Sequence, residues 1–181
     1  MNKEIEVKVI GENFGRIRTE LLNHGFKKIY TGHIVTHYLD FPDMRLAKNK
    51  QMLRIRKSGN EYSLGYKNTK KDSGISVYDE IETHIQDGQK ALEIFKNIGL
   101  ILSDTLDKTR DIYRRETPKI EIVFDKLHEN HEDIPEYMEI EAETEELIHN
   151  LLSLLKIKKE NIKPLNSHEL IEYFRDSVGK K

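Results

Sequence analysis

The segment Glu4-Ile5-Glu6-Val7-Lys8-Val9 alternates strictly between charged and aliphatic residues, and this pattern decides the fold of the chain. Successive side chains of a β-strand point to opposite faces of the sheet, so the segment predicts a strand with one charged face and one apolar face. The same alternation returns along the chain, which favours an antiparallel sheet of many strands. The other alternating segments are 53–56, 62–67, 80–82, 108–113, 120–125 and 138–142.

Helical spacing of apolar residues appears in four places between and after these segments. The apolar faces belong to residues 14–22, 91–98, 147–155 and 170–174. Gly25 and Gly99 follow the first two as stop signals. Thr144 precedes the third, and Ser167 is expected to cap the fourth. We therefore expect an α+β protein that is mostly β, with its helices packed on the aliphatic face of the sheet.

The charged face of this sheet does not have the composition of an ordinary solvent-exposed face. Like charges two positions apart repel on one strand face, glutamate is a poor strand former, and a surface shaped only for solubility intersperses the two signs. Here Glu-Ile-Glu occurs at 4–6, 80–82 and 139–141, and basic pairs occur at Arg54/Arg56 and Lys108/Arg110. We interpret these single-sign rows as a functional site.

The chemistry that needs such rows is the binding of a metal–polyphosphate complex. Clustered carboxylates suit hard divalent cations such as Mg²⁺ or Mn²⁺, which prefer oxygen ligands. Arginine and lysine suit phosphoryl oxygens. If the sheet closes into a barrel, the charged rows line its interior and the aliphatic rows pack against helices outside.

Composition bounds the remaining possibilities. The 181 residues carry 30 basic and 32 acidic side chains, a formal net charge of −2, and no cysteine. Neither nucleic acid nor a membrane is expected as a partner, because no net field attracts them. Disulfides and thiolate chemistry are excluded. No apolar run approaches the about 18 residues of a membrane span and the first residues do not form a signal peptide, so we expect one cytoplasmic domain over residues 1–181.

The ordered set of charged strands resembles the CYTH superfamily, also called triphosphate tunnel metalloenzymes. Glu4-Ile5-Glu6-Val7-Lys8 resembles the amino-terminal ExExK signature of that family, and the likeness continues in order along nearly the whole chain. The further matching segments are His37-Tyr38-Leu39-Asp40, Leu53-Arg54-Ile55-Arg56, Tyr66-Lys67, Glu80-Ile81-Glu82, Lys108 with Arg110 and Tyr113, Asp125, Glu139-Ile140-Glu141, and Ser167 with Glu169-Leu170-Ile171.

The resemblance implies a closed eight-stranded antiparallel β-barrel, a tunnel with a charged interior, that binds a triphosphate with one or two Mg²⁺ or Mn²⁺ ions. It implies phosphate contacts from Lys8, Arg54, Arg56, Lys67, Lys108 and Arg110. It implies metal ligands among Glu4, Glu6, Glu82, Asp125, Glu139 and Glu141, led by Glu4, Glu139 and Glu141. The catalytic set that it implies is Glu4, Glu6, Lys8, Glu80, Glu82 and Asp125.

The chain departs from the family pattern in four places. Only Met1-Asn2-Lys3 precede Glu4, so the His-Phe lead-in of characterised cyclases does not fit. Tyr78 stands where the family often has a basic residue, two positions before the central Glu pair. Ile134-Pro135-Glu136-Tyr137 replaces the Leu-Gly-x-Phe lead-in to the last pair, and Ser167-His168 replaces a closing Ser-Tyr. These changes leave the charged set intact but weaken any transfer of substrate identity.

Three functions of different classes remain open at this point. The first is hydrolysis of the terminal phosphate of a nucleoside, thiamine or inorganic triphosphate. The second is a class IV adenylate cyclase, which converts ATP to cyclic AMP and pyrophosphate. The third is a module that binds nucleotides or polyphosphate without turnover; the intact carboxylates disfavour it. The sequence also leaves a homodimer open. The His128/His131 pair is interpreted as part of a polar loop, and no P-loop signature is present.

Overall fold

The strands of the protein close on one another to form a barrel. A computed structural model describes residues 2–71 and 74–178. In this part of the chain nine strands form one antiparallel sheet in the order β5-β4-β3-β2-β6-β7-β8-β1-β9. A further pairing of β5 with β1 closes eight of these strands into a ring, and β9 pairs with the end of β1. The prediction of a closed eight-stranded antiparallel barrel is confirmed.

The strands and helices have the following bounds. The strands are β1 (Asn2–Val9), β2 (Lys27–Asp40), β3 (Gln51–Ser58), β4 (Glu61–Lys71), β5 (Ser76–Ile85), β6 (Ile101–Glu116), β7 (Lys119–Leu127), β8 (Tyr137–Ala142) and β9 (Ile162–Lys163). The α-helices are α1 (Phe14–Asn23), α2 (Arg45–Lys48), α3 (Gly88–Asn97), α4 (Glu145–Leu154) and α5 (Ser167–Val178). Two short 3₁₀ helices are η1 (Glu129–His131) and η2 (Lys159–Asn161).

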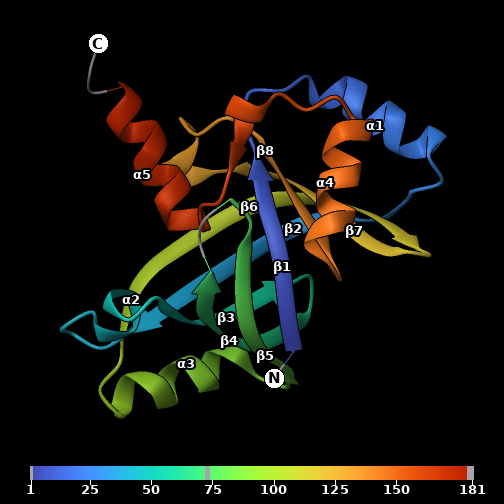
Figure 1. The fold of residues 1–181 in the computed structure, drawn as a ribbon. Coiled ribbons are helices and arrows are strands. Elements are labelled where there is room, and N and C mark those ends of the chain that lie inside the picture. Colours follow the sequence, from blue (N-terminus) through green and yellow to red (C-terminus); the bar gives the residue numbers. More distant parts are fainter. Residues whose placement is uncertain (1, 72–73, 179–181) are drawn as a thin grey trace.

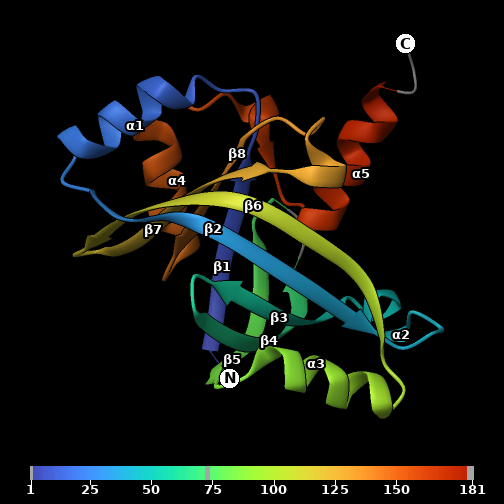
Figure 2. The same cartoon turned by 180° about the vertical axis from the view of Figure 1, so that it is seen from behind.

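The helices pack around the barrel rather than inside it. Figure 1 shows β1 upright in the wall, with α1 and α4 beside its upper part, α3 below and α5 on the opposite upper side. Seen from the back in Figure 2, the long strands β2 and β6 cross together in front of β1. None of the helices in residues 2–71 and 74–178 combines the length and the apolar character that crossing a bilayer requires.

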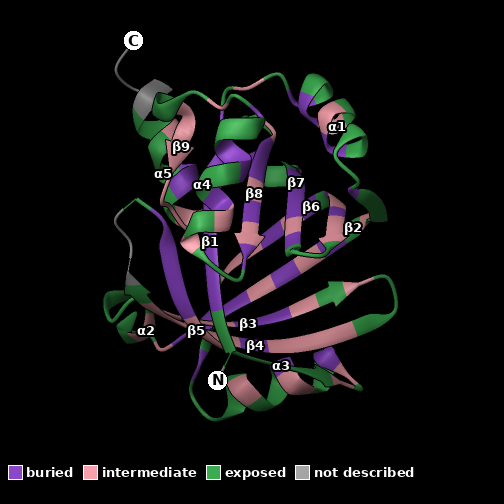
Figure 3. Cartoon of the chain, turned by 45° about the vertical axis from the view of Figure 1, so that its right-hand side comes forward, coloured by how far each residue is buried: buried purple, intermediate pink, exposed green. Residues whose placement is uncertain are grey.

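The aliphatic face of the strands forms the main core with α1 and α4, as the alternation predicts. Ile5 and Val7 of β1 are almost fully buried there with Ile17 of α1 and Ile148 of α4. Figure 3 shows β1 and β8 largely buried, while α1 and α3 are exposed on their outer sides. Burying one such side chain stabilises the fold by about 1.5–3 kcal/mol. Because the apolar residues of β1 are used outside the barrel, its charged residues face inward.

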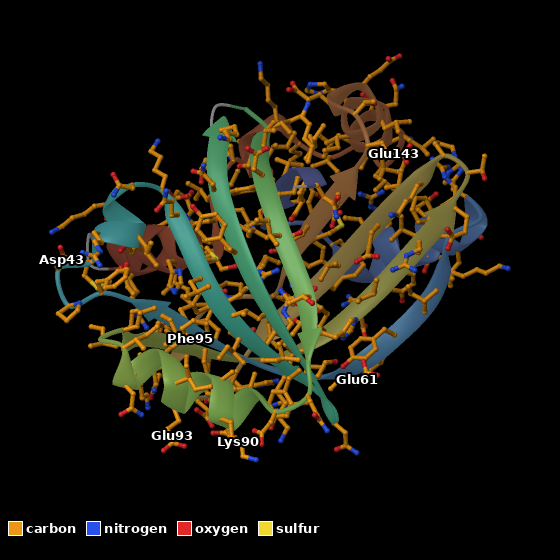
Figure 4. All side chains as sticks on the ribbon, turned by 90° about the horizontal axis from the view of Figure 1, so that it is seen from below. Asp43, Glu61, Lys90, Glu93, Phe95 and Glu143 are labelled. Atoms are coloured by element: carbon orange, nitrogen blue, oxygen red, sulfur yellow. The ribbon has the colours of Figure 1, made fainter. Side chains whose placement is uncertain are left out.

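A second apolar layer lies under the strands β3 and β4 and is covered by α3. Leu92 of α3 is buried there with Ile55 of β3, and Phe95 packs against this layer. Seen from below in Figure 4, Lys90 and Glu93 point away from the barrel on the outer side of α3, whereas Phe95 lies on its inner side. Helices therefore cover the barrel on more than one side.

The predicted helix ends are mostly correct. Gly25 follows α1 with φ +79°, a conformation that favours glycine, and Thr144 caps α4 by accepting a hydrogen bond from the amide of Leu147. The prediction that Ser167 caps α5 is wrong. Ser167 is already the first helical residue, and the Asn166 side chain accepts hydrogen bonds from the amides of His168 and Glu169 instead.

Candidate active site

The charged faces of the strands meet inside the barrel and line a cavity of about 190 Å³. Every predicted site residue except Asp125 lines this tunnel, namely Glu4, Glu6, Lys8, Arg54, Arg56, Lys67, Glu80, Glu82, Lys108, Arg110, Glu139 and Glu141. Asp125 is on the same inward face of β7 as Glu121 but is fully buried beside the cavity, where it contacts two of the lining cations. The period-two pattern is the physical cause, because each strand has to turn its charged face away from the apolar shell.

The strands β1 and β8 place their charged residues in direct register. Glu6 lies opposite Glu141, and Lys8 lies opposite Glu139. The Lys8 side chain is 2% exposed, and its ammonium lies 2.9 Å from both a Glu6 and a Glu139 oxygen. Burial alone would favour neutral lysine, but the two carboxylates outweigh it and hold the pKa of Lys8 well above its ordinary value. Lys8 is therefore charged, and it joins the carboxylates of Glu6 on β1 and Glu139 on β8.

Asp125 holds two tunnel cations in place. Its carboxylate accepts a hydrogen bond from the Nε of Arg110 at 2.7 Å and another from Nη2, and it also contacts the Lys108 ammonium. Burial opposes ionisation of Asp125, but Arg110 and Lys108 outweigh it and lower its pKa. Burial and the neighbouring Arg110 lower the pKa of Lys108 to about 8. Both Asp125 oxygens are used by these cations, so its contribution here is to orient them.

The guanidinium groups of β3 are less completely paired. Arg54 donates through Nη2 to Glu80 at 3.0 Å and to Glu82 at 3.3 Å. Arg56 forms no ion pair within the described residues, and its Nε is buried without a hydrogen-bond partner. Burial, with Arg54 and Arg110 nearby, lowers the pKa of Arg56 to about 10. Arg56 therefore marks a place in the tunnel that lacks an anion.

The carboxylates near β1 are also incompletely paired, in their case with cations. Lys67 contacts one oxygen of Glu4, but Glu4 Oε2 is buried without a hydrogen-bond partner. Burial, with the Glu4 carboxylate as the next cause, raises the pKa of Glu141 to about 8. Burial also raises the pKa of Glu6, even though Lys8 and Lys67 oppose it. The carboxylates of Glu4, Glu6 and Glu141 therefore outnumber the two ammonium groups beside them, those of Lys8 and Lys67.

The donor set of this carboxylate cluster fits a hard divalent ion. Such an ion takes oxygen ligands, and the unpartnered Glu4 oxygen beside Glu141 supplies them in a buried position. In residues 2–71 and 74–178, no group of three or more His, Asp or Glu side chains is arranged to hold a metal ion. The reason is visible in the contacts, since the carboxylates of Glu4 and Glu6 turn toward Lys67 and Lys8. The predicted metal ligands stay a prediction.

Several residues that shape the tunnel were not part of the predicted site. Tyr38 and Tyr78 line it, as does Glu121, which is held by Arg114 at 2.7 Å. Gly65 gives Arg54 room, because a Cβ there would lie 3.1 Å from Arg54 Nε and 3.3 Å from Glu82 Oε2. The signal for Glu121 is its alternation with Asp125, which puts both side chains on the same strand face.

Comparison with known proteins gives a consistent family likeness. A sequence model of the CYTH domain matches residues 2–168. A Methanocaldococcus jannaschii protein named "Putative adenylate cyclase" is 29% identical over 166 residues, which cover 88% of this chain and 93% of that relative.

Two solved structures share the fold. A Vibrio parahaemolyticus protein described as "a putative adenylate cyclase" superposes with a TM-score of 0.79 at 14% identity, over 93% of this chain and 97% of that one. A Hippeastrum protein described as a "Putative adenylyl cyclase" that "reveals a dominant triphophatase activity" superposes with a TM-score of 0.67 at 18% identity, over 98% and 96% of the two chains.

Proposed function

Because the chain belongs to the CYTH domain family, we propose that it is a divalent-metal-dependent enzyme that hydrolyses the terminal phosphate of a triphosphate. This proposal rests on one observation, that the same tunnel holds a cation without an anionic partner and carboxylates with too few cations. Arg56 has no ion-pair partner within the described residues, and of the two acids Glu4 and Glu141 only Glu4 is paired, through one oxygen to Lys67. A metal–triphosphate complex supplies both charges at once.

The basic residues would bind the phosphate chain. Arg56 and Arg54 carry buried Nε–H groups without partners, so they can donate to phosphoryl oxygens without first losing a hydrogen bond at that atom. Lys108 and Arg110 are fixed by Asp125 before any substrate arrives. Such preorganised cations stabilise charge that develops on the phosphoryl oxygens during transfer, and positioning with charge neutralisation is most of what this chemistry requires.

The acidic residues Glu4, Glu6 and Glu141 would hold the metal ion, with Glu139 and Glu82 beside them in the tunnel. A bound divalent cation neutralises phosphate charge and makes nearby water more acidic. Glu4 now contacts Lys67, and Glu6 contacts Lys8. If these carboxylates held an ion instead, the two ammonium groups would be available to phosphate oxygens.

Cyclisation is the second candidate, because the relative at 29% identity carries the name "Putative adenylate cyclase". The two reactions use the same tunnel residues and differ in which phosphorus faces the nucleophile. A binding module without turnover is disfavoured, because binding phosphate alone needs the basic residues and not the carboxylate cluster.

The deciding experiment offers ATP, thiamine triphosphate and tripolyphosphate to the protein with Mg²⁺ and Mn²⁺ in separate reactions, followed by ³¹P NMR of the products. Orthophosphate as the released product supports hydrolysis. Pyrophosphate together with cyclic AMP replaces the proposal by the cyclase. Binding of the triphosphates without any product leaves only the non-catalytic module.

A further inference from the structure

Tyr78 of β5 is a neutral aromatic residue among the charged residues of the tunnel wall. It lies directly opposite Glu4 of β1, is 5% exposed and lines the tunnel cavity. The Lys67 ammonium lies over its ring, 5.3 Å from the centroid. This distance is within the about 6 Å of a cation–π interaction, which is stronger when the pair is removed from water. Burial and the Glu6 carboxylate raise the pKa of the Tyr78 hydroxyl, so the side chain stays neutral.

The other partners of Lys67 are carboxylates. Its ammonium contacts Glu4 and lies 3.9 Å from a Glu6 oxygen and 3.6 Å from a Glu80 oxygen. Burial would lower the pKa of Lys67, but these carboxylates, led by Glu4, outweigh it and raise the pKa. Lys67 is therefore charged, and Glu4 is its nearest acidic partner.

The proposed reaction would remove most of these acidic partners. Glu4 and Glu6 are assigned to the metal ion, so their oxygens would no longer hold Lys67. The remaining oxygen, Oε1 of Glu80, already accepts a hydrogen bond from Arg54 at 3.0 Å. A lysine ammonium stands on a flexible four-carbon stem, and fixing it in one place costs rotamer entropy. Lys67 therefore needs a further partner to stay in position.

The ring of Tyr78 can hold Lys67 without competing for the metal ion or for phosphate. Hard divalent ions take oxygen ligands, and the face of the ring offers none. A carboxylate at this position would neutralise Lys67, whereas the uncharged ring leaves its positive charge for phosphate oxygens. The ring also covers only one side of the ammonium, which has three N–H donors. The CYTH pattern often has a basic residue here, which would bind phosphate directly rather than through a neighbour.

Resting on the proposed function, we propose that Tyr78 is a positioning residue for phosphate binding. When the Glu4 carboxylate turns to the metal ion, the ring of Tyr78 holds the Lys67 ammonium inside the tunnel and presents its N–H groups to the phosphate chain. The effect of Tyr78 on the substrate passes through Lys67, and it depends on the ring rather than on the hydroxyl.

The first test separates the ring from the hydroxyl. Tyr78→Phe keeps the ring, whereas Tyr78→Leu removes it and keeps an apolar side chain. The probe is the imido analogue of tripolyphosphate with Mg²⁺, whose P–N–P bridges resist hydrolysis, and calorimetry measures its affinity. Tyr78→Leu should weaken binding by about 5–30-fold, the scale of a cation–π contact, and Tyr78→Phe should keep most of the affinity. The kcat/KM for tripolyphosphate should follow the same order.

Tyr66→Leu is the matched control. Tyr66 directly precedes Lys67 in β4, so its side chain is on the outer face of the barrel, and it does not line the tunnel cavity. The same chemical change beside Lys67 should therefore leave binding and turnover unchanged. If Tyr78→Leu is too unstable to assay, Tyr78→Met replaces it, because methionine adapts its shape to the space that the ring leaves.

The second test asks whether Tyr78 acts through Lys67. The Lys67→Met variant lacks the ammonium, so adding Tyr78→Leu to it should cost no further affinity for the imido analogue. The two changes should therefore be non-additive in a double-mutant cycle. A purely structural role of Tyr78 would cost the same factor in both backgrounds.

The outcomes separate this inference from the proposed function. Equal affinities in Tyr78→Leu and Tyr78→Phe, or additive effects in the double variant, overturn the role of the ring and leave the hydrolase standing. Absence of turnover with every triphosphate overturns the proposed function. The binding measurements then still decide whether Tyr78 positions Lys67, because they do not depend on turnover.

Discussion

Glu6 of β1 lies directly opposite Glu141 of β8, and both line the tunnel. Like charges placed opposite each other on a sheet destabilise it. Lys8 offsets the charge of Glu6 at 2.9 Å, whereas Glu141 forms no ion pair within the described residues. As the pH rises through the pKa of Glu141, the fold therefore gains a buried acidic pair whose repulsion a bound cation would relieve, and this strain can be measured.

The first prediction follows from the raised pKa of Glu141. Its pKa is about 8 in the folded protein against 4.5 in the unfolded chain, so the folded state binds more protons between these values. The free energy of unfolding therefore decreases as the pH rises from 4.5 to 8. Glu141→Gln should remove this loss of stability. With a chelator present, the variant should be more stable than the wild type by about 1–3 kcal/mol at pH 8. One pKa unit corresponds to about 1.4 kcal/mol, and the partial exposure of Glu141 reduces the effect.

Urea unfolding at pH 4.5 and pH 8 measures this difference. Glu143→Gln is the control, since Glu143 is exposed just after the same strand and Figure 4 shows it at the periphery. A Glu141→Gln variant that is no more stable than the wild type at pH 8 would contradict the acidic strain.

The second prediction concerns the metal ion. Because Glu141 is largely protonated at neutral pH, binding of Mg²⁺ or Mn²⁺ should displace a proton. Calorimetric titration of the ion in two buffers with different ionisation enthalpies measures that proton directly, without substrate. Activity should stop when EDTA is in excess and return with added ion. Full turnover in excess EDTA would contradict the assignment of a metal ion.

The third prediction tests the unpaired guanidinium. Arg56→Ala should lower kcat/KM by about 10²-fold or more, the scale of losing one preorganised electrostatic contact. The melting temperature should stay equal or rise, because Arg56 is buried near Arg54 and Arg110 without an ion pair. Lys57→Ala is a control on the same strand, with its exposed side chain near the Tyr62 ring outside the tunnel. Unchanged kinetics in Arg56→Ala would show that the charged face is only a solvent-exposed face of the sheet and not a functional site.

The fourth prediction tests the outer face of the same barrel. Val7→Ala should lower the free energy of unfolding by about 1–4 kcal/mol, because it leaves a cavity beneath α1 and α4. The kcat/KM of the folded fraction should change little, since Val7 points away from the tunnel. Glu146→Gln, at the exposed start of α4, should cost no more than about 0.5 kcal/mol. A kinetic defect in Val7→Ala as large as that of Arg56→Ala would remove the distinction between the two faces.

The sequence pattern predicted the barrel wall better than the features that join elements together. Alternation in residues 4–9 is enough to predict which side chains enter the tunnel, because strand geometry leaves only two faces. It carries no information on which cation pairs with which acid, and so Arg56 could not be distinguished from Arg54 before the structure. Ion pairing depends on the register between strands, which follows from barrel closure.

The second cavity, of about 430 Å³ at the mouth of the tunnel, could not be predicted from any local pattern. Its walls come from α2, β6 and α5, which are far apart in sequence, and its residues are of ordinary types. Asp40 shows the difficulty, because its role in fixing the α2 turn depends on three backbone amides rather than on a motif. The cap of α5 was assigned to Ser167 for a similar reason, since Asn166 and Ser167 are both good capping residues and only geometry selects between them.

The closure of the ring through β1 also bears on how the chain folds. β1 is the first strand in the chain, yet its partners are β5 in the middle and β8 near the far end. Contacts between such distant segments form slowly, because the intervening chain has to lose loop entropy first. During synthesis on the ribosome, β1 cannot meet β8 until the chain has grown past residue 142. Charged side chains on an unpaired strand oppose its association with other chains, so the residues that line the tunnel would also keep the waiting segment of β1 hydrated.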